Sequence, residues 1–171
     1  EYYWGKNWGV ITSPHNPEVI KRTQQTVREF KYDIPCDILF EDQLGARPWQ
    51  YDLNPKARDP VLYKQGLIDF AKRDSKQIPV MCEGGFDGLM PYVVAFSDLA
   101  VNNSLPPDKV FNNWYGEGNW ETFPYALYVA HDKNGFYQHN LAHEVFTDAK
   151  DKLMWNVAYG HNFTQGYWPK E

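Results

Sequence analysis

The 171-residue sequence has only two cysteines, no long apolar run and no excess of basic residues. Cys36 and Cys82 are too few for a disulfide scaffold, and their separation does not fit a zinc ribbon or a redox pair. No apolar run approaches the roughly 18 residues that a membrane span requires, so we expect no membrane partner. The chain has 22 acidic and 17 basic residues, and it has no run of basic residues that would neutralise phosphate groups. This composition argues against a dedicated nucleic-acid binder.

Aromatic residues are abundant, with 7 Trp, 12 Tyr and 10 Phe, although the mean hydropathy is polar at -0.64. The C–H face of a sugar ring stacks on an aromatic ring, and sugar hydroxyl groups bind to polar side chains such as Asp, Asn, Gln and Arg. The composition therefore favours a carbohydrate ligand, although about half of these rings are expected to fill the core. Length and 43% hydrophobic content indicate a single globular domain over residues 1–171.

Helices and strands are expected to alternate along the chain. Asn16-Pro17-Glu18 combines a capping residue, a proline and a first-turn acid, which predicts a helix to about Phe30. The apolar segment 37–40 predicts a strand that ends in Glu41-Asp42, and a second helix from Asp59-Pro60 begins a repeat of this order. The other predicted elements are strands at 8–12, 78–82, 123–130 and 162–167, and helices at 90–101 and 147–159.

This alternation predicts an α/β fold with a parallel sheet. Acidic or polar residues at the carboxyl ends of successive strands favour a (β/α)8 barrel over an open doubly wound sheet. Five strands cannot close a barrel, and a whole barrel takes about 200 residues or more. We therefore expect a partial (β/α)8 TIM barrel from about the third strand onward, with the remainder of the barrel supplied by a longer parent chain. Without the rest of the barrel, this segment should expose two unpaired strand edges and associate with other copies of itself.

Two acids occupy equivalent points at the ends of two predicted strands, Asp42 after 37–40 and Glu83 after 78–82. Because the carboxyl ends of parallel strands meet at one mouth, these side chains are expected to face each other. Glycoside hydrolysis uses such a pair, one carboxylate as nucleophile or base and one carboxyl group as proton donor. Either acid alone is explained equally well as a loop brace.

Neighbouring acids compete for both roles. Side chains alternate along a strand, so only one of Glu41 and Asp42 can face the barrel axis. We assign that position to Asp42, at the rim, and expect Glu41 to pair with Arg47. Asp87 competes with Glu83 but follows Gly84-Gly85, and it either binds substrate or shapes the turn.

Three segments carry a family resemblance: Asp37-Ile38-Leu39-Phe40-Glu41-Asp42-Gln43-Leu44-Gly45, Val80-Met81-Cys82-Glu83-Gly84-Gly85 and Tyr125-Ala126-Leu127-Tyr128-Val129-Ala130-His131-Asp132. Together they resemble the catalytic barrel of glycoside hydrolases of the endo-α-N-acetylgalactosaminidase type and related glycosidase-like barrels. The resemblance implies a retaining glycosidase with its nucleophile at Asp42 and its acid/base at Glu83. The sequence departs from some relatives in having Glu41, and not an apolar residue, before the Asp.

Other residues are candidates for substrate binding. His131-Asp132 fits a clamp on substrate hydroxyl groups, or a hydrogen bond that holds the following loop. His139 and His143 have helical spacing, but the order of the adjacent Glu144 does not fit a zinc helix, so we expect no metal and no cofactor. Aromatic and cationic candidates for the substrate cleft are Arg47, Trp49, Trp114 and Trp120.

The sequence thus predicts a glycosidase that acts on a neutral carbohydrate. The alternatives are a non-catalytic carbohydrate-binding barrel and a metal-dependent hydrolase that uses His131, His139 and His143. We expect the protein to be secreted, periplasmic or at the cell surface. We also expect Cys36 and Cys82 to be unbonded, because they lie at opposite ends of neighbouring strands.

Overall fold

The structure is a computed structural model. It describes residues 2–4, 7–9, 11–34, 36–46, 51–97, 125–137, 154, 157–158 and 160–162. Contacts divide the chain into two compact units, residues 1–39 with 47–79, and residues 40–46 with 80–171. No helix among the described residues is long and apolar enough to cross a membrane.

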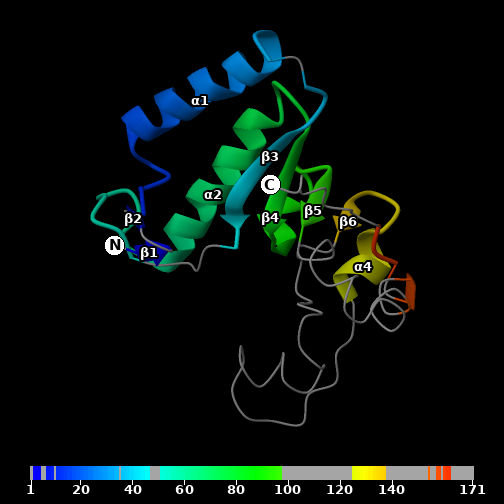
Figure 1. Ribbon diagram of the computed structural model, residues 1–171. Helices are drawn as coiled ribbons and strands as arrows, with labels where there is room; N and C mark the ends of the chain where they lie inside the picture. The colour runs from blue at the N-terminus through cyan, green and yellow to red at the C-terminus, as the bar shows by residue number, and fades with distance from the viewer. Residues whose placement is uncertain are drawn as a thin grey trace. The chain divides into compact units, whose positions relative to one another are not determined.

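The first unit contains a small antiparallel sheet and two helices (Figure 1). Strands β1 (Tyr2–Trp4) and β2 (Asn7–Gly9) pair with each other. Of the strand expected at 8–12, residues 8 and 9 belong to β2 and pair in this small sheet and not in the parallel one, while residues 11 and 12 are not in a strand.

Helices α1 (Pro17–Tyr32) and α2 (Pro60–Asp74) confirm the two helices predicted from their capping sequences. The Asn16 side chain accepts a hydrogen bond from the Glu18 amide at 2.9 Å, and Asp59 accepts one from the Leu62 amide at 2.9 Å. Each side chain satisfies an amide that the first turn of the helix leaves without a backbone acceptor, which fixes where the helix begins.

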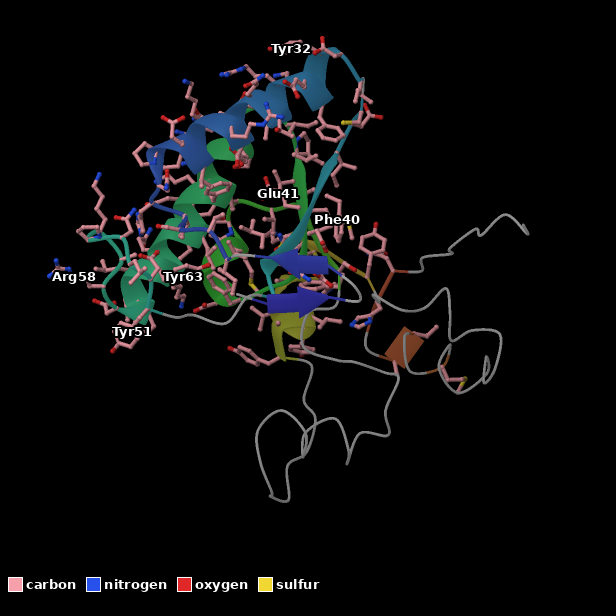
Figure 2. The ribbon with its side chains drawn as sticks, turned by 60° about the vertical axis from the view of Figure 1, so that its left-hand side comes forward. Tyr32, Phe40, Glu41, Tyr51, Arg58 and Tyr63 are labelled. Carbon is pink, nitrogen blue, oxygen red and sulfur yellow. The ribbon has the colours of Figure 1, made fainter. Side chains whose placement is uncertain are left out.

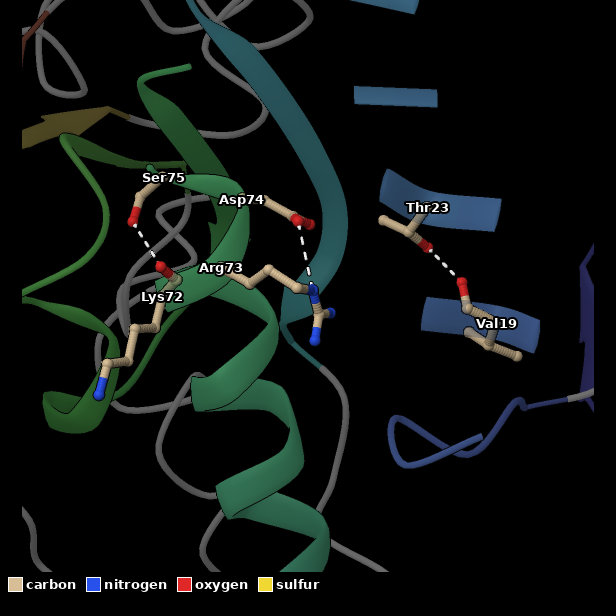
Figure 3. Close-up of polar contacts among 6 residues, drawn as sticks. All are labelled: Val19, Thr23, Lys72, Arg73, Asp74 and Ser75. Atoms are coloured by element: carbon tan, nitrogen blue, oxygen red, sulfur yellow. Dashed lines mark hydrogen bonds and ion pairs between the residues drawn. The ribbon is translucent and has the colours of Figure 1, made fainter. Parts of the chain in front are cut away.

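Local polar contacts support both helices (Figure 3). The Thr23 hydroxyl donates to the Val19 carbonyl at 3.0 Å in α1. At the end of α2, Arg73 Nε lies 3.6 Å from Asp74 Oδ1, and the Ser75 hydroxyl donates to the Lys72 carbonyl at 3.3 Å. Asp74 is fully buried, so the neighbouring guanidinium partly offsets the cost of removing its charge from water.

The four-stranded sheet consists of β3 (Leu39–Gly45), β4 (Val80–Gly84), β5 (Ala95–Ser97) and β6 (Gly135–Tyr137). All four strands are parallel and neighbours in space follow chain order, β3-β4-β5-β6 (Figure 1). The predicted α/β fold with a parallel sheet is thus confirmed. The described residues form four parallel strands where five were expected, and Asn162 adds a single bridge to Tyr137.

The more buried face of this sheet forms the core of the second unit. Val80, Cys82 and Phe96 have no exposed surface, and Phe136 is 2% exposed. The rings of Phe96 and Phe136, from neighbouring strands, stack with their centroids 5.7 Å apart. Such a ring pair adds to the free energy gained by burial alone.

Two predicted elements are wrong. The segment expected as a strand at 123–130 contains helix α4 (Tyr125–Ala130), in which Leu127 and Ala130 are buried at helical spacing while Tyr128 is exposed. The helix expected at 90–101 is not observed in its described part, residues 90–97, which follow the 3-10 turn η1 (Asp87–Leu89) and end in the buried strand β5. The helix expected at 147–159 lies mostly outside the described residues.

Candidate active site

The two acids that the sequence singled out lie on neighbouring parallel strands. Asp42 is the fourth residue of β3 and Glu83 is the fourth residue of β4. The Leu39 amide donates to the Pro79 carbonyl at 2.9 Å, and in a parallel ladder this hydrogen bond places Leu39 opposite the residue that follows Pro79. Continued without interruption, this register brings Asp42 opposite Glu83, with both side chains on the same face of the sheet.

The burial of alternate residues agrees with this register. In β4, Val80 and Cys82 are buried while Met81 and Glu83 are half-buried. In β3, Phe40 and Asp42 are exposed, Phe40 to 46%, whereas Glu41 is half-buried. The more accessible face therefore carries Phe40, Asp42, Met81 and Glu83. Asp42 therefore lies on the accessible face of the sheet and Glu41 on the more buried one, while the expectation that Asp42 faces a barrel axis stays a prediction.

Glu41 has a different environment from Asp42, although the two are adjacent in sequence. Both carboxylate oxygens of Glu41 are buried, while the Asp42 side chain is exposed (Figure 2 labels Phe40 and Glu41 on β3). The salt bridge expected between Glu41 and Arg47 involves a residue outside the described part of the chain. Glu83 is intermediate, with one carboxylate oxygen, Oε2, buried.

Cys82 is a buried thiol on β4, adjacent in sequence to Glu83. Burial, as the larger cause, and the negative charges of Glu41 and Glu83 together raise the pKa of the Cys82 thiol to about 12. The thiol donates weakly to the Gly84 carbonyl at 3.4 Å. A thiol in this state is protonated at neutral pH and is no nucleophile, because the thiolate is the reactive form. Cys36 and Cys82 are both free thiols, as expected.

Backbone conformation changes immediately after the two acids. Gln43 has φ 60° and is the one residue other than glycine with a positive φ among the described residues, and Gly84 has φ 64°. A Cβ atom on Gly45 would lie 2.6 Å from the carbonyl carbon of Gly84 and from the amide nitrogen of Gly85. The backbone of β4 therefore leaves no room for a side chain at Gly45. The sequence placed a glycine turn here, but the αL conformation of Gln43 has no sequence signal.

Asp87 has a local structural role. Its carboxylate accepts a hydrogen bond from the Gly88 amide at 2.9 Å, and its carbonyl accepts one from the Met90 amide at 3.2 Å. These contacts support the interpretation that Asp87 shapes the turn. Asp87 is exposed, and its binding to substrate stays a prediction.

His131 and Asp132 follow helix α4 and not a strand end, so the position that suggested a substrate clamp is not the one observed. His131 Nδ1 lies 3.1 Å from the Tyr128 carbonyl oxygen. The Lys133 ammonium donates to Asp132, and this hydrogen bond lowers the pKa of the Asp132 carboxyl group. Both side chains are exposed and their contacts lie within the turn.

The remaining substrate-binding candidates, Arg47, Trp49, Trp114 and Trp120, lie outside the described residues, as do His139 and His143. Within the part of the chain that the structure describes, no group of three or more His, Cys, Asp or Glu side chains is arranged to hold a metal ion.

Comparison with known proteins adds no relative: no protein-family model, no curated protein and no solved structure matches the chain.

Proposed function

We propose that the protein is a retaining glycosidase built on part of a (β/α)8 barrel, with Asp42 as nucleophile and Glu83 as acid/base. The observation that carries this proposal is the position of the two acids on adjacent parallel strands, Asp42 in the middle of β3 and Glu83 one residue before the end of β4, in a register that gives them the same face of the sheet. The sequential order of the strands agrees with a barrel, because a doubly wound sheet reverses its strand order at the ligand site.

The different surroundings of the two acids suit the two roles. Glycosidases distinguish an attacking carboxylate from a proton-donating carboxyl group by their environments. Asp42 is exposed and accessible to an anomeric carbon, while Glu83 has one buried oxygen. In the proposed reaction, Asp42 forms a bond to the anomeric carbon as Glu83 protonates the departing glycosidic oxygen. Glu83 then deprotonates the water that releases the sugar from Asp42.

A panel of aryl glycosides tests the proposal on the full-length protein. Asp42→Asn and Glu83→Gln should each reduce kcat by at least about 100-fold, the lower range for losing a positioned catalytic proton donor or acceptor. The matched controls are Asp69→Asn and Glu18→Gln, which change exposed acids of α2 and α1 and should leave activity unchanged. Azide should rescue Asp42→Ala and give a glycosyl azide with the configuration opposite to that of the normal product.

Two results separate this proposal from its rivals. If Glu41→Gln abolishes hydrolysis and Asp42→Asn does not, the nucleophile is the buried acid and the assignment is wrong. If no glycoside is hydrolysed but sugars bind with unchanged affinity to Asp42→Asn and Glu83→Gln, the protein is a non-catalytic carbohydrate-binding barrel.

A further inference from the structure

The two strands that carry the acids are joined at two points, one before the acids and one after. The first is the hydrogen bond from the Leu39 amide to the Pro79 carbonyl. The second is the close passage of Gly45 against Gly84 and Gly85. Asp42 and Glu83 both lie between these points, so the geometry at the two ends limits how far one strand can slide along the other.

The two strands use different numbers of residues between these points. From Leu39 to Gly45 the chain advances six residues, whereas from Val80, opposite Leu39, to Gly84 and Gly85, which Gly45 approaches equally closely, it advances four and five. Strand β3 therefore uses more residues than β4, which is the property of a β-bulge, and bulges redirect side chains near active sites. Gln43 is the residue of β3 with φ 60°, which identifies it as the site of the bulge.

Each glycine of the second contact is required by space. A Cβ on Gly45 would lie 2.6 Å from backbone atoms of Gly84 and Gly85, and a Cβ on Gly84 would lie 2.7 Å from the Ala46 amide nitrogen. Backbone cannot rotate away as a flexible side chain does, so any larger residue must separate the strands or change their register. Gly84 also has φ 64°, a conformation that strains other residues.

We propose that Gln43, Gly45 and Gly84 are positioning residues that hold the carboxyl groups of Asp42 and Glu83 at their working separation. The inference rests on the proposed function, since that function assigns the two acids their roles. The bulge at Gln43 ends the regular ladder directly after Asp42, and the glycine contact fixes the strand ends one residue after Glu83 and three residues after Asp42. These residues act through the acids and touch no substrate in the proposed reaction.

The main test is Gly45→Ala and Gly84→Ala in the full-length protein, assayed with the aryl glycoside that the wild type hydrolyses best. We expect kcat to fall by about 100-fold with KM little changed, because a shift of about 1 Å in a reacting group has a cost of this size.

Two glycines of the same chain supply matched controls. Gly66→Ala introduces a Cβ 2.6 Å from the Pro14 side chain in the first unit, so it reproduces crowding without touching the acid-bearing strands. Gly160→Ala introduces a Cβ at φ 72° with no atom within 4 Å, so it reproduces the backbone strain of Gly84 without the crowding. Both controls should lose stability and retain kcat. If Gly45→Ala and Gly84→Ala lose no more kcat than these controls, the inference is wrong.

A second pair of variants decides the matter if the glycine variants do not fold. Gln43→Gly accepts a positive φ without strain and should keep the wild-type kcat, whereas Gln43→Val disfavours that conformation and should lower kcat at constant KM. Equal kcat in these two variants would contradict the bulge as a positioning device.

Crystal structures separate this inference from the proposed function. In Gly45→Ala and Gln43→Val, the distance between the carboxyl carbons of Asp42 and Glu83 should differ from the wild-type distance by about 1 Å, and in Gly66→Ala it should not. A changed distance in a protein that hydrolyses no glycoside would uphold the positioning role and reject the glycosidase. An unchanged distance in both Gly45→Ala and Gln43→Val would overturn the positioning role whatever the activity.

Discussion

Substitution of Asn134 should destabilise the parallel sheet more than any surface change near it. Asn134 precedes β6 and is 6% exposed. Its side-chain amide donates to the Val93 carbonyl at 2.6 Å and to the Met90 carbonyl at 3.2 Å. One side chain thus satisfies two carbonyl groups of the segment that leads into β5, and it ties that segment to the start of the neighbouring strand.

The cost of Asn134→Ala follows from those two hydrogen bonds. Each contributes about 1 kcal/mol net, and a buried carbonyl left without its donor costs about 1–3 kcal/mol. Since solvent can reach part of the turn in the variant, we expect the free energy of unfolding to fall by about 2–4 kcal/mol. For a chain of this length that lowers Tm by on the order of 10 °C. Asn134→Asp keeps the shape but presents only acceptors to two carbonyls at neutral pH, so it should lose at least as much.

Urea denaturation followed by circular dichroism measures the change, with Lys133→Ala as the control. Lys133 is the adjacent residue, its side chain is 74% exposed, and its ion pair with Asp132 is at the surface, so the control should change the free energy of unfolding by less than about 1 kcal/mol. An Asn134→Ala variant within about 0.5 kcal/mol of wild type would show that the two carbonyls do not depend on the side chain, and the proposed link between β5 and β6 would be wrong.

Three further predictions concern a buried imidazole, a buried thiol and a helix cap. Burial lowers the pKa of His161 from 6.5 to about 4, so the unfolded chain binds the proton more readily than the folded one. The free energy of unfolding should therefore decrease by up to about 3 kcal/mol as the pH falls from 6.5 to 4. Urea denaturation midpoints across this range measure the decrease, and an equal decrease in His161→Asn would contradict its assignment to His161. Because the pKa of Cys82 is raised to about 12, iodoacetamide at pH 8 should modify Cys36 and leave Cys82 unmodified in the native protein. Peptide mass spectrometry measures the labelling of each cysteine, and equal labelling would refute the burial of Cys82. Asp59→Ala removes the side chain that accepts the hydrogen bond from the Leu62 amide, and it should lower the free energy of unfolding, measured by thermal denaturation, by about 1 kcal/mol. Asp59→Asn still accepts that hydrogen bond and should lower the free energy less. Equal losses in the two variants would argue against capping.

Sequence patterns predicted those elements whose signals are local. The starts of α1 and α2 are encoded by Asn16-Pro17 and Asp59-Pro60, whose side chains make the capping hydrogen bonds with residues of the same first turn. The segment that contains α4 was mispredicted because a short apolar run such as Tyr125-Ala126-Leu127-Tyr128-Val129-Ala130 fits a buried strand and a short helix equally well. Its surroundings select the helix, by burying Leu127 and Ala130 three residues apart.

Strand β5 was missed for a related reason. The apolar residues of the segment that contains Ala95–Ser97 also match the spacing of a helix. What selects a strand is the pairing of this segment with the neighbouring strands β4 and β6. Phe96 lies opposite Cys82 on one side and Phe136 on the other, with all three side chains buried. A strand buried on both faces gains its stability from neighbours that are distant in sequence, and no periodicity within the segment shows them.

The candidate site also combines features that local sequence predicts with features that depend on distant residues. Acids on two neighbouring strands follow from the sequence, although Asp42 lies in the middle of β3 and not after its end, because the strand expected at 37–40 runs from Leu39 to Gly45. The face that each acid occupies depends on the register between strands 41 residues apart in the chain. Glu41 and Asp42 are consecutive, so a slip of one residue would exchange the buried acid for the exposed one. Such a slip would move Asp42 to the side of Cys82 and Glu41 to the accessible face.

This exchange explains why the constraint on register matters more here than in an ordinary strand pair. A slip in β3 would not only alter apolar burial but also put Glu41 in place of Asp42 on the accessible face, and so replace the proposed nucleophile by another acid. The hydrogen bond from Leu39 to Pro79 opposes the slip from one end. The contact of Gly45 with Gly84 opposes it from the other, because it leaves no room for a side chain at either position. Stability of the sheet and placement of the two proposed catalytic acids therefore depend on the same backbone contacts.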